Sequence, residues 1–147
     1  MPYAAVADFV ETVSEAEAIA LAKAVLPATG YDATRILGAL TDASSELDTY
    51  FAARYPTPLS PVPEPAKQAA IALAREALDR NGRDHVLKAA ARWRTWAKDV
   101  AKGVAVLGGG VVGADVPAAA AASGAQFSAP GRVFTDDSLA GFLGRSS

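Results

Sequence analysis

The stretch DATRILGALTDASSELDTYFAARYPTPLSPVP, residues 32–63, decides the fold of this chain. In its first part, apolar side chains recur at steps of three and four residues, which places them on one face of an α-helix. Asp32 precedes this pattern as a predicted N-cap, and Tyr31 and Ile36 have the spacing of a hydrophobic staple. The helix face that we expect to be buried consists of Ile36, Leu37, Leu40, Ala43, Leu47, Tyr50, Phe51 and Arg54.

Five prolines between residues 56 and 65 end this helix and shape the segment after it. Pro56 disfavours the helical conformation of Tyr55, so the helix is predicted to stop there. The later prolines cannot donate a backbone hydrogen bond, and their φ angles are held near polyproline values. The sequence therefore predicts a stiff, extended connector after a long amphipathic helix.

Length and composition limit the possible classes. The 147 residues suffice for one domain with a single core. Hydrophobic residues make up 51% of the chain, but many are alanine, which favours helix. With 14 basic and 16 acidic residues the net charge is -2, which argues against a protein whose main task is to neutralise phosphates. The chain has no cysteine, no basic leader and no apolar run of about 20 residues, so we expect a soluble, non-secreted protein without membrane contact.

Further helices are predicted on both sides of the central one. A short helix covers VADFVET at residues 6–12, and Ser14 with Glu17 has the capping-box spacing that opens a second helix, ending near residues 26–30. After the proline-rich connector, Pro65 is predicted as the first residue of a fourth helix, which ends at Asn81 and Gly82. A last helix spans about residues 84–102. The predicted fold is mainly α, a compact bundle of four to five helices over residues 1–102. Its expected apolar faces include Ile19, Leu21, Ala22, Val25 and Leu26 in the second helix. In the helix that starts at Pro65 they include Ala69, Ala70, Ile71, Leu73, Ala77 and Leu78.

The predicted helix at residues 84–102 carries the clearest charge pattern, with an apolar arc on one side and basic residues on the other. The simplest interpretation is a solvated helix surface; the functional one is contact with an acidic subunit surface or with passing DNA. Trp93 is expected in the core, whereas Trp96 lies at the edge of the apolar arc and is a candidate interface anchor. The candidate residues for a subunit interface or a DNA contact are Lys88, Arg92, Arg94, Trp96 and Lys98.

Composition changes after Lys102, and we predict that residues 103–147 form an extended, Gly/Ala-rich C-terminal arm separate from the helical domain. The runs VAVL and VV within residues 104–112 are compatible with a short β-hairpin. Thr135 can cap a last helical turn, and the large apolar side chains around it favour docking over exposure. The arm therefore folds back on its own domain or binds a partner, with the candidate docking residues Arg132, Phe134, Leu139, Phe142 and Leu143.

Several motifs, taken in their order along the chain, resemble those of the Mu-like phage head–tail connector family. They are MPYA at residues 1–4, ADF at 7–9, ALTDAS at 39–44, ELDTY at 46–50, RYP at 54–56, PL at 58–59, PVP at 61–63, RVF at 132–134 and SLAGF at 138–142. The resemblance implies a structural protein of the virion neck, present in the host cytoplasm during assembly. It implies a homo-oligomeric ring, matched to a dodecameric portal, that binds the portal protein and a downstream neck or tail-completion protein. DNA would pass through the bore without being read, and the arm would dock on the portal or on a neighbouring subunit.

Catalytic, cofactor and metal sites are not expected. The one histidine, His85, stands beside Asp84 at the predicted solvent edge of a helix, and no cysteine or second histidine is available to complete a metal or nucleophile site. The glycine run at residues 108–110 lacks the lysine and hydroxyl residue of a phosphate-binding loop. We therefore expect no enzyme. The alternatives to a connector are a small helical DNA-binding module and an assembly scaffold protein.

Overall fold

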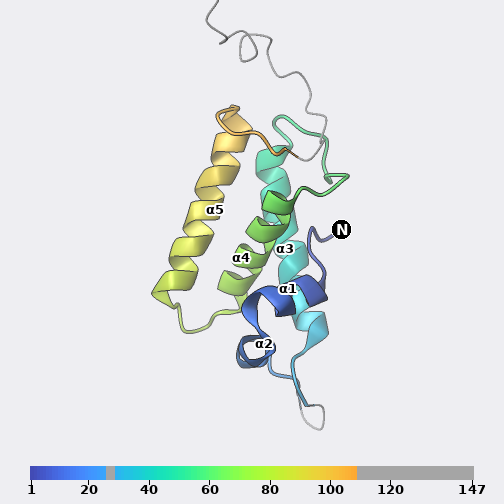
Figure 1. The fold of residues 1–147 in the computed structure, drawn as a ribbon, viewed down its shortest axis with the longest axis vertical. Helices are drawn as coiled ribbons and strands as arrows, with labels where there is room; N and C mark the ends of the chain where they lie inside the picture. The colour runs from blue at the N-terminus through green and yellow to red at the C-terminus, as the bar shows by residue number, and fades with distance from the viewer. Residues whose placement is uncertain (26–28, 109–147) are drawn as a thin grey trace, which may run out of the picture. The chain divides into compact units, whose positions relative to one another are not determined.

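In the computed structural model, which describes residues 1–25 and 29–108, the chain forms five packed α-helices (Figure 1). In chain order they are α1 (Val6–Val13), α2 (Glu15–Leu21), α3 (Ala33–Phe51), α4 (Glu64–Leu78) and α5 (Asp84–Lys102). The predicted mainly α fold is therefore confirmed. Residues 104–107, the first run of the suggested hairpin, form no strand, and its second run and the rest of the arm lie outside the described residues.

Helix α3 is the centre of the bundle and packs against α1, α4 and α5. It begins as predicted, because Asp32 Oδ1 accepts hydrogen bonds from the backbone N–H groups of Thr34 and Arg35 at 3.0 and 3.1 Å. Most of the predicted face is buried, but Leu37 is 43% exposed and Tyr50 is half-buried, because the neighbouring helices cover only part of that arc. The buried residues of α3 are Ile36, Ala39, Leu40, Ala43, Ser44, Leu47 and Phe51.

Helix α4 is rich in alanine, so its neighbours can approach closely. It begins at Glu64, and Pro65 takes the second position, where its missing N–H leaves no intrahelical hydrogen bond unmade. The predicted buried face is wrong at Ala77, which is exposed, whereas Ala66 and Ala74 are fully buried. This difference arises because α1, α3 and α5 all pack on α4, so a wider arc is buried than a two-helix contact would give.

Helix α2 ends earlier than the sequence predicts. It stops at Leu21, and an antiparallel bridge then joins Lys23 to Tyr31. Backbone hydrogen bonds on both sides of this bridge satisfy groups that a longer helix would have used. Val25, predicted on the apolar face, is consequently 80% exposed, and Leu26 lies outside the described residues.

The N-terminal segment is fixed to α3 by Tyr3, a contact that the sequence did not predict. The backbone N–H of Tyr3 donates to Ser44 Oγ at 2.8 Å; its hydroxyl donates to the Asp48 carboxylate and accepts from the Leu59 N–H at 3.2 Å. Burial of the side chain and the hydrogen bond to Asp48 raise the pKa of the Tyr3 hydroxyl well above its ordinary value. One residue thus joins the N-terminus, α3 and the proline-rich loop.

The variant Tyr3→Phe is expected to lower the free energy of unfolding by about 1 kcal/mol at neutral pH, because the Leu59 N–H and Asp48 lose their partner. Since the pKa of Tyr3 is raised by folding, the folded chain keeps this proton at a pH where the unfolded chain loses it. The contribution of the Tyr3 hydroxyl to the free energy of unfolding is therefore complete below its pKa in the unfolded chain, about 10. This contribution is lost as the pH rises toward its pKa in the folded chain. Chemical denaturation across the alkaline range should show the stabilities of wild type and variant converging above about pH 10.

Leu37→Ala, an exposed position of α3 whose substitution changes no titratable group, is the control for this experiment. The stability difference between wild type and this variant should stay constant over the same pH range. Parallel curves for wild type and Tyr3→Phe would contradict the prediction.

The chain continues in the core after α5. Gly103 ends this helix in the left-handed conformation, with a φ of 77°, and the backbone then turns back over the bundle. Leu107 is 2% exposed, and its N–H donates to the hydroxyl of the buried Tyr55 at 3.4 Å. Tyr55 stands at the start of the proline-rich loop, in which two peptide bonds that precede proline are cis. The core thus includes Leu107, which belongs to the segment that we predict as the start of the arm.

Candidate functional site

The five candidate residues of α5 differ in their exposure. Lys88, Arg92 and Trp96 follow one another at four-residue steps and share a stripe, whereas Arg94 and Lys98 share a second stripe. The three residues Lys88, Arg92 and Lys98 are exposed, and the other two are partly buried. Of the candidate set, the three exposed cations can therefore belong to an outward basic face, whereas Arg94 and Trp96 contact neighbouring helices.

Arg94 binds two carboxylates of its own chain. Its Nε and Nη2 atoms contact the Glu46 carboxylate at 2.6 and 3.3 Å, and Nη2 also lies 2.7 Å from Glu76 Oε2. Hydrogen bonds to Glu46, and then to Glu76, raise the pKa of the Arg94 guanidinium further above its ordinary value. Because Glu46 belongs to α3 and Glu76 to α4, this side chain joins three helices.

The two tryptophans of α5 are held in fixed positions by aromatic contacts. The ring of Trp96 stands edge-on to Phe51 of α3 and to Trp93, with centroid distances of 5.8 and 5.3 Å. Trp93, predicted in the core, is partly buried against it, and the Arg92 guanidinium lies 5.6 Å from its ring centroid. Each indole keeps some exposed surface on a rigid support, as aromatic interface anchors do.

The outward face of α5 keeps exposed cations after these internal contacts are made. Lys88 is exposed, but its Nζ lies 2.9 Å from Asp84 Oδ2, one helical turn earlier. Arg92, Lys98 and Lys102 are also exposed and take part in no ion pair within the described part of the chain. This face can contact an acidic partner, but its sparse charge differs from the dense basic surface typical of nucleic-acid binding.

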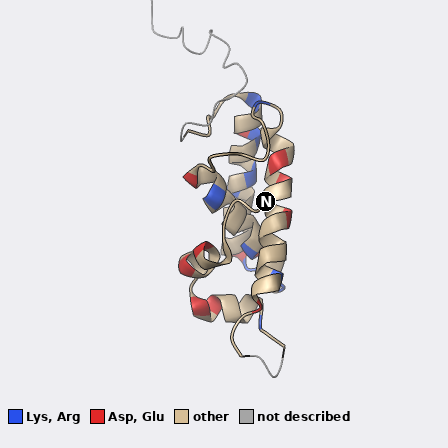
Figure 2. Cartoon of the chain, turned by 90° about the vertical axis from the view of Figure 1, so that its right-hand side faces the viewer, with Lys and Arg blue, Asp and Glu red and all other residues tan. Residues whose placement is uncertain are grey.

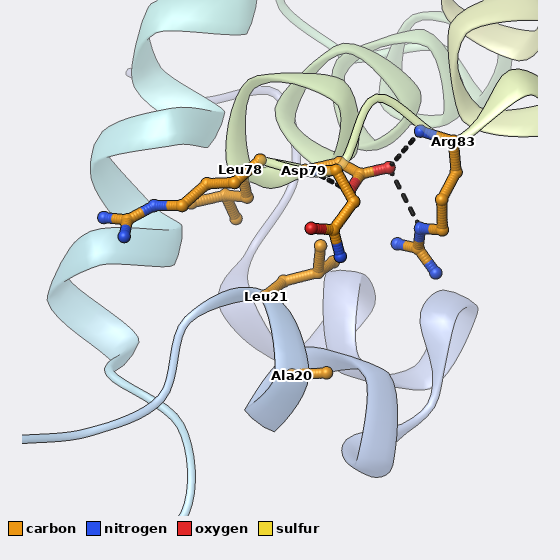
Figure 3. Close-up of a pocket in the computed structure, with 7 residues that line it drawn as sticks. Ala20, Leu21, Leu78, Asp79 and Arg83 are labelled. Carbon is orange, nitrogen blue, oxygen red and sulfur yellow. Dashed lines mark hydrogen bonds and ion pairs between the residues drawn. The ribbon is translucent and has the colours of Figure 1, made fainter.

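A second charged cluster joins α2 to α4 and to the turn between α4 and α5, and Figure 3 shows the contacts between its Asp79 and Arg83. The Glu17 carboxylate accepts from Arg75 at 2.8 and 2.9 Å and from Arg83 at 2.8 Å. Asp79, whose side chain is 3% exposed, accepts from the backbone and the side chain of Arg83 at 3.1 and 2.9 Å. Burial by itself would raise the pKa of Asp79, but the hydrogen bonds from Arg83 and from the Asn81 N–H outweigh it and lower the pKa.

This cluster changes the predicted capping box of α2. Ser14 Oγ accepts from the Glu17 N–H at 3.4 Å as expected, but the Glu17 carboxylate binds the two arginines, and the Ser14 N–H donates to Val10 O. The contact between Glu17 and Arg75 could not be predicted from a local sequence pattern, because the two residues are distant in the chain. The pocket beside the cluster is lined by Ala20, Leu21, Leu78, Asp79, Arg80, Asn81 and Arg83 (Figure 3). Because most of the charges in the cluster are paired with each other, the cluster stabilises the contact between α2, α4 and the turn after α4.

The remaining site predictions concern the arm and the single histidine. The candidate docking residues between 132 and 143 lie outside the described residues. His85 is exposed, as predicted, with its Nε2 atom 3.4 Å from Arg75 Nη2. Among residues 1–25 and 29–108, no group of three or more His, Cys, Asp and Glu side chains could hold a metal ion. None of the helices in that part of the chain is long and apolar enough to cross a membrane.

Comparison with known protein families finds a match that covers most of the chain. The family model described as "Bacteriophage Mu, Gp36" matches residues 3–126. The match begins at Tyr3, includes all five helices and extends into the arm. No curated protein matches the chain.

Proposed function

The chain belongs to the bacteriophage Mu Gp36 family, and from this premise we propose that it is a structural protein of the phage neck, connecting the DNA-filled head to the tail. In this role it forms a ring beneath the portal protein, which we expect to be a dodecamer, and contacts a downstream neck or tail-completion protein. DNA passes through the bore without being read. The observation that carries the proposal is the match to a phage family over residues 3–126, and the ordered motifs that resemble a head–tail connector support it.

The internal contacts of the described body suit a role that depends on shape. Arg94 joins α3, α4 and α5, Glu17 joins α2 to the turn before α5, and Tyr3 joins the N-terminus to α3. Partly buried ion pairs and hydrogen bonds of this kind restrict the arrangement of the helices. A ring component needs such a rigid body, because its neighbours bind surfaces whose relative positions must not change.

We expect the arm to supply the contact with the portal or with an adjacent subunit, through Arg132, Phe134, Leu139, Phe142 and Leu143. Leu107, near the start of the predicted arm, is buried in the core and attaches the arm to the body at that point. We expect the large apolar residues of the arm to make the contact with the partner. Repetition around a ring would strengthen a weak individual contact through avidity.

Capture of the matching portal protein tests this role. At a salt concentration that permits assembly, the full chain is expected to bind the portal protein. A chain that ends at Gly108 is expected not to bind it. The truncation is placed after Gly108 because Leu107 belongs to the core. A full-length variant, Phe134→Ser/Phe142→Ser, should lose binding to a similar extent, since each serine removes large apolar contact area.

Circular dichroism provides the control, since both altered chains should keep the helical signal of the wild type. A full chain that fails to bind the portal would overturn the proposed function. Equal portal binding by all three chains would show that the arm is not the docking element.

A further inference from the structure

Two edges of the five-helix body carry opposite charge, with α4 between them. On one side of α4, Lys67 pairs with Asp8 of α1; on another, Glu76 pairs with Arg94 of α5. Helices α1 and α2 contain four acidic residues and no basic residue. Figure 2 colours the acidic and basic residues along the chain. Helix α5 contains five basic and two acidic residues. The charge of the body is therefore distributed unevenly although the net charge of the chain is small.

Some of these charged side chains form ion pairs within the chain. Among the described residues, the exposed charged side chains without such a partner are acidic on α1 and α2 and basic on α5. On α1 and α2, Asp8 and Glu17 pair within the chain, and Glu11 and Glu15 remain exposed; we call these two residues the acidic edge. On α5, Arg94 is paired within the chain. The cations that remain exposed and unpaired within the described part form the basic edge, which consists of Arg92, Lys98 and Lys102.

We propose that the basic edge of one copy binds the acidic edge of a second copy, so that the copies associate head to tail. This inference rests on the proposed function and specifies the contact that builds its ring. The two edges are different surfaces, so each added copy presents a new free edge, and the series closes into a ring when the rotation per copy divides a full turn. Charge complementarity of this kind fixes orientation and partner choice.

A second copy suits the basic edge better than DNA does. Leu87, which is 42% exposed, and the exposed Ala91 lie on the same side of α5 as Lys98, at steps of four and seven residues. A protein surface can cover such apolar area, whereas a phosphate backbone uses mainly the charges. The net charge of -2 also opposes binding of the whole chain to DNA.

Because the 147-residue chain has no cysteine, single introduced cysteines can report which edges meet. The full-length variants Arg92→Cys and Glu11→Cys are treated with a short bismaleimide, alone and as an equimolar mixture. A head-to-tail contact predicts little cross-linking of either variant alone and a one-to-one covalent dimer in the mixture. The double variant should give a ladder of multimers. Arg80→Cys, at an exposed position in the turn between α4 and α5, is the matched control and should cross-link to Glu11→Cys only at background level.

Sedimentation of charge-reversed chains gives a second, independent readout at low salt. The variants Arg92→Glu/Lys98→Glu and Glu11→Lys/Glu15→Lys should each weaken self-association by about tenfold to a hundredfold, because attraction becomes repulsion at two positions. Mixing the two variants should restore association, since each reversed edge then meets its complement. Arg80→Glu should behave like the wild type. Added salt should weaken association of the wild type, because exposed charges are screened beyond about 8 Å at physiological ionic strength.

Several results would overturn the head-to-tail contact. One is a single-cysteine variant that cross-links to itself as well as the mixture does, which would indicate a two-fold symmetric contact. Another is a wild-type chain that stays monomeric at its highest soluble concentration in low salt. A third is salt-dependent DNA binding that Arg92→Glu/Lys98→Glu abolishes while cross-linking through other positions persists, which would assign this edge to DNA. Portal capture is measured separately, so a chain that binds the portal but fails these tests would keep the proposed function and lose only this contact.

Discussion

Phe51→Ala is expected to lower the free energy of unfolding of the five-helix body by about 3–5 kcal/mol. Phe51 is fully buried near the end of α3, with its ring centroid 6.4 Å from that of Tyr3 and 5.8 Å from that of Trp96. Removal of the ring opens a cavity where the N-terminal segment, α3 and α5 meet. The loss of stability should lie at the upper end of the range for single substitutions, because these three segments cannot all move to fill the cavity.

Chemical denaturation measures this loss. Both tryptophans of the chain lie on α5 and Trp96 touches Phe51, so tryptophan fluorescence follows the region that the substitution disturbs. Leu37→Ala is the matched control on the same helix; Leu37 is 43% exposed, and a change within about 0.5 kcal/mol is expected. Similar losses for the two variants would contradict the assignment of Phe51 to the centre of the core.

Arg94→Met is expected to destabilise the fold by about 1–3 kcal/mol. Methionine keeps much of the apolar length of arginine but removes the hydrogen bonds to Glu46 and Glu76, and it leaves those two carboxylates near each other without a cation. The side chain of Arg94 is 33% exposed, so solvent screening keeps the loss below that of a fully buried pair. The result would identify Arg94 as a residue of the fold and not of a docking surface.

Lys98→Met is the control for Arg94→Met, because Lys98 is an exposed cation of the same helix. Its stability should differ from that of the wild type by no more than about 0.5 kcal/mol. A double-mutant cycle with Glu46→Gln should show that the two losses are not additive, since both substitutions break the same interaction. Additive losses, or an Arg94→Met chain as stable as the control, would refute the three-helix link.

The long helices could be predicted from the sequence because their signals are local. The Asp32 cap, the steps of three and four through α3, and the glycine and proline residues at the helix ends are all contained in short windows, and the structure confirms the start of α3 and the bounds of α5. The end of α2 was predicted wrongly for the opposite reason. The bridge between Lys23 and Tyr31 competes with continuation of the helix, and residues close in space but separated in sequence decide the outcome.

The partners of polar side chains could not be predicted in the same way. Periodicity placed Arg94 among the basic residues of α5, yet a long guanidinium at the edge of the arc can turn toward any carboxylate that the packing brings near. Glu17 had the position of a capping-box residue but found stronger partners in Arg75 and Arg83. The two arginines offer the Glu17 carboxylate an opposite charge as well as hydrogen bonds, whereas the Ser14 N–H already donates to Val10 O.

By itself, the sequence determined that this chain is a mainly helical protein with a central amphipathic helix, a proline-rich turn and motifs of a phage family. It did so because helix periodicity, capping and chain stiffness depend on residues within a few positions of one another. Only the tertiary structure decided which charges are paired inside the body and which remain exposed, leaving Glu11 and Glu15 on one edge and Arg92, Lys98 and Lys102 on the other. That division depends on distances between helices far apart in the chain, and pairing across such distances is set by packing and not by local pattern.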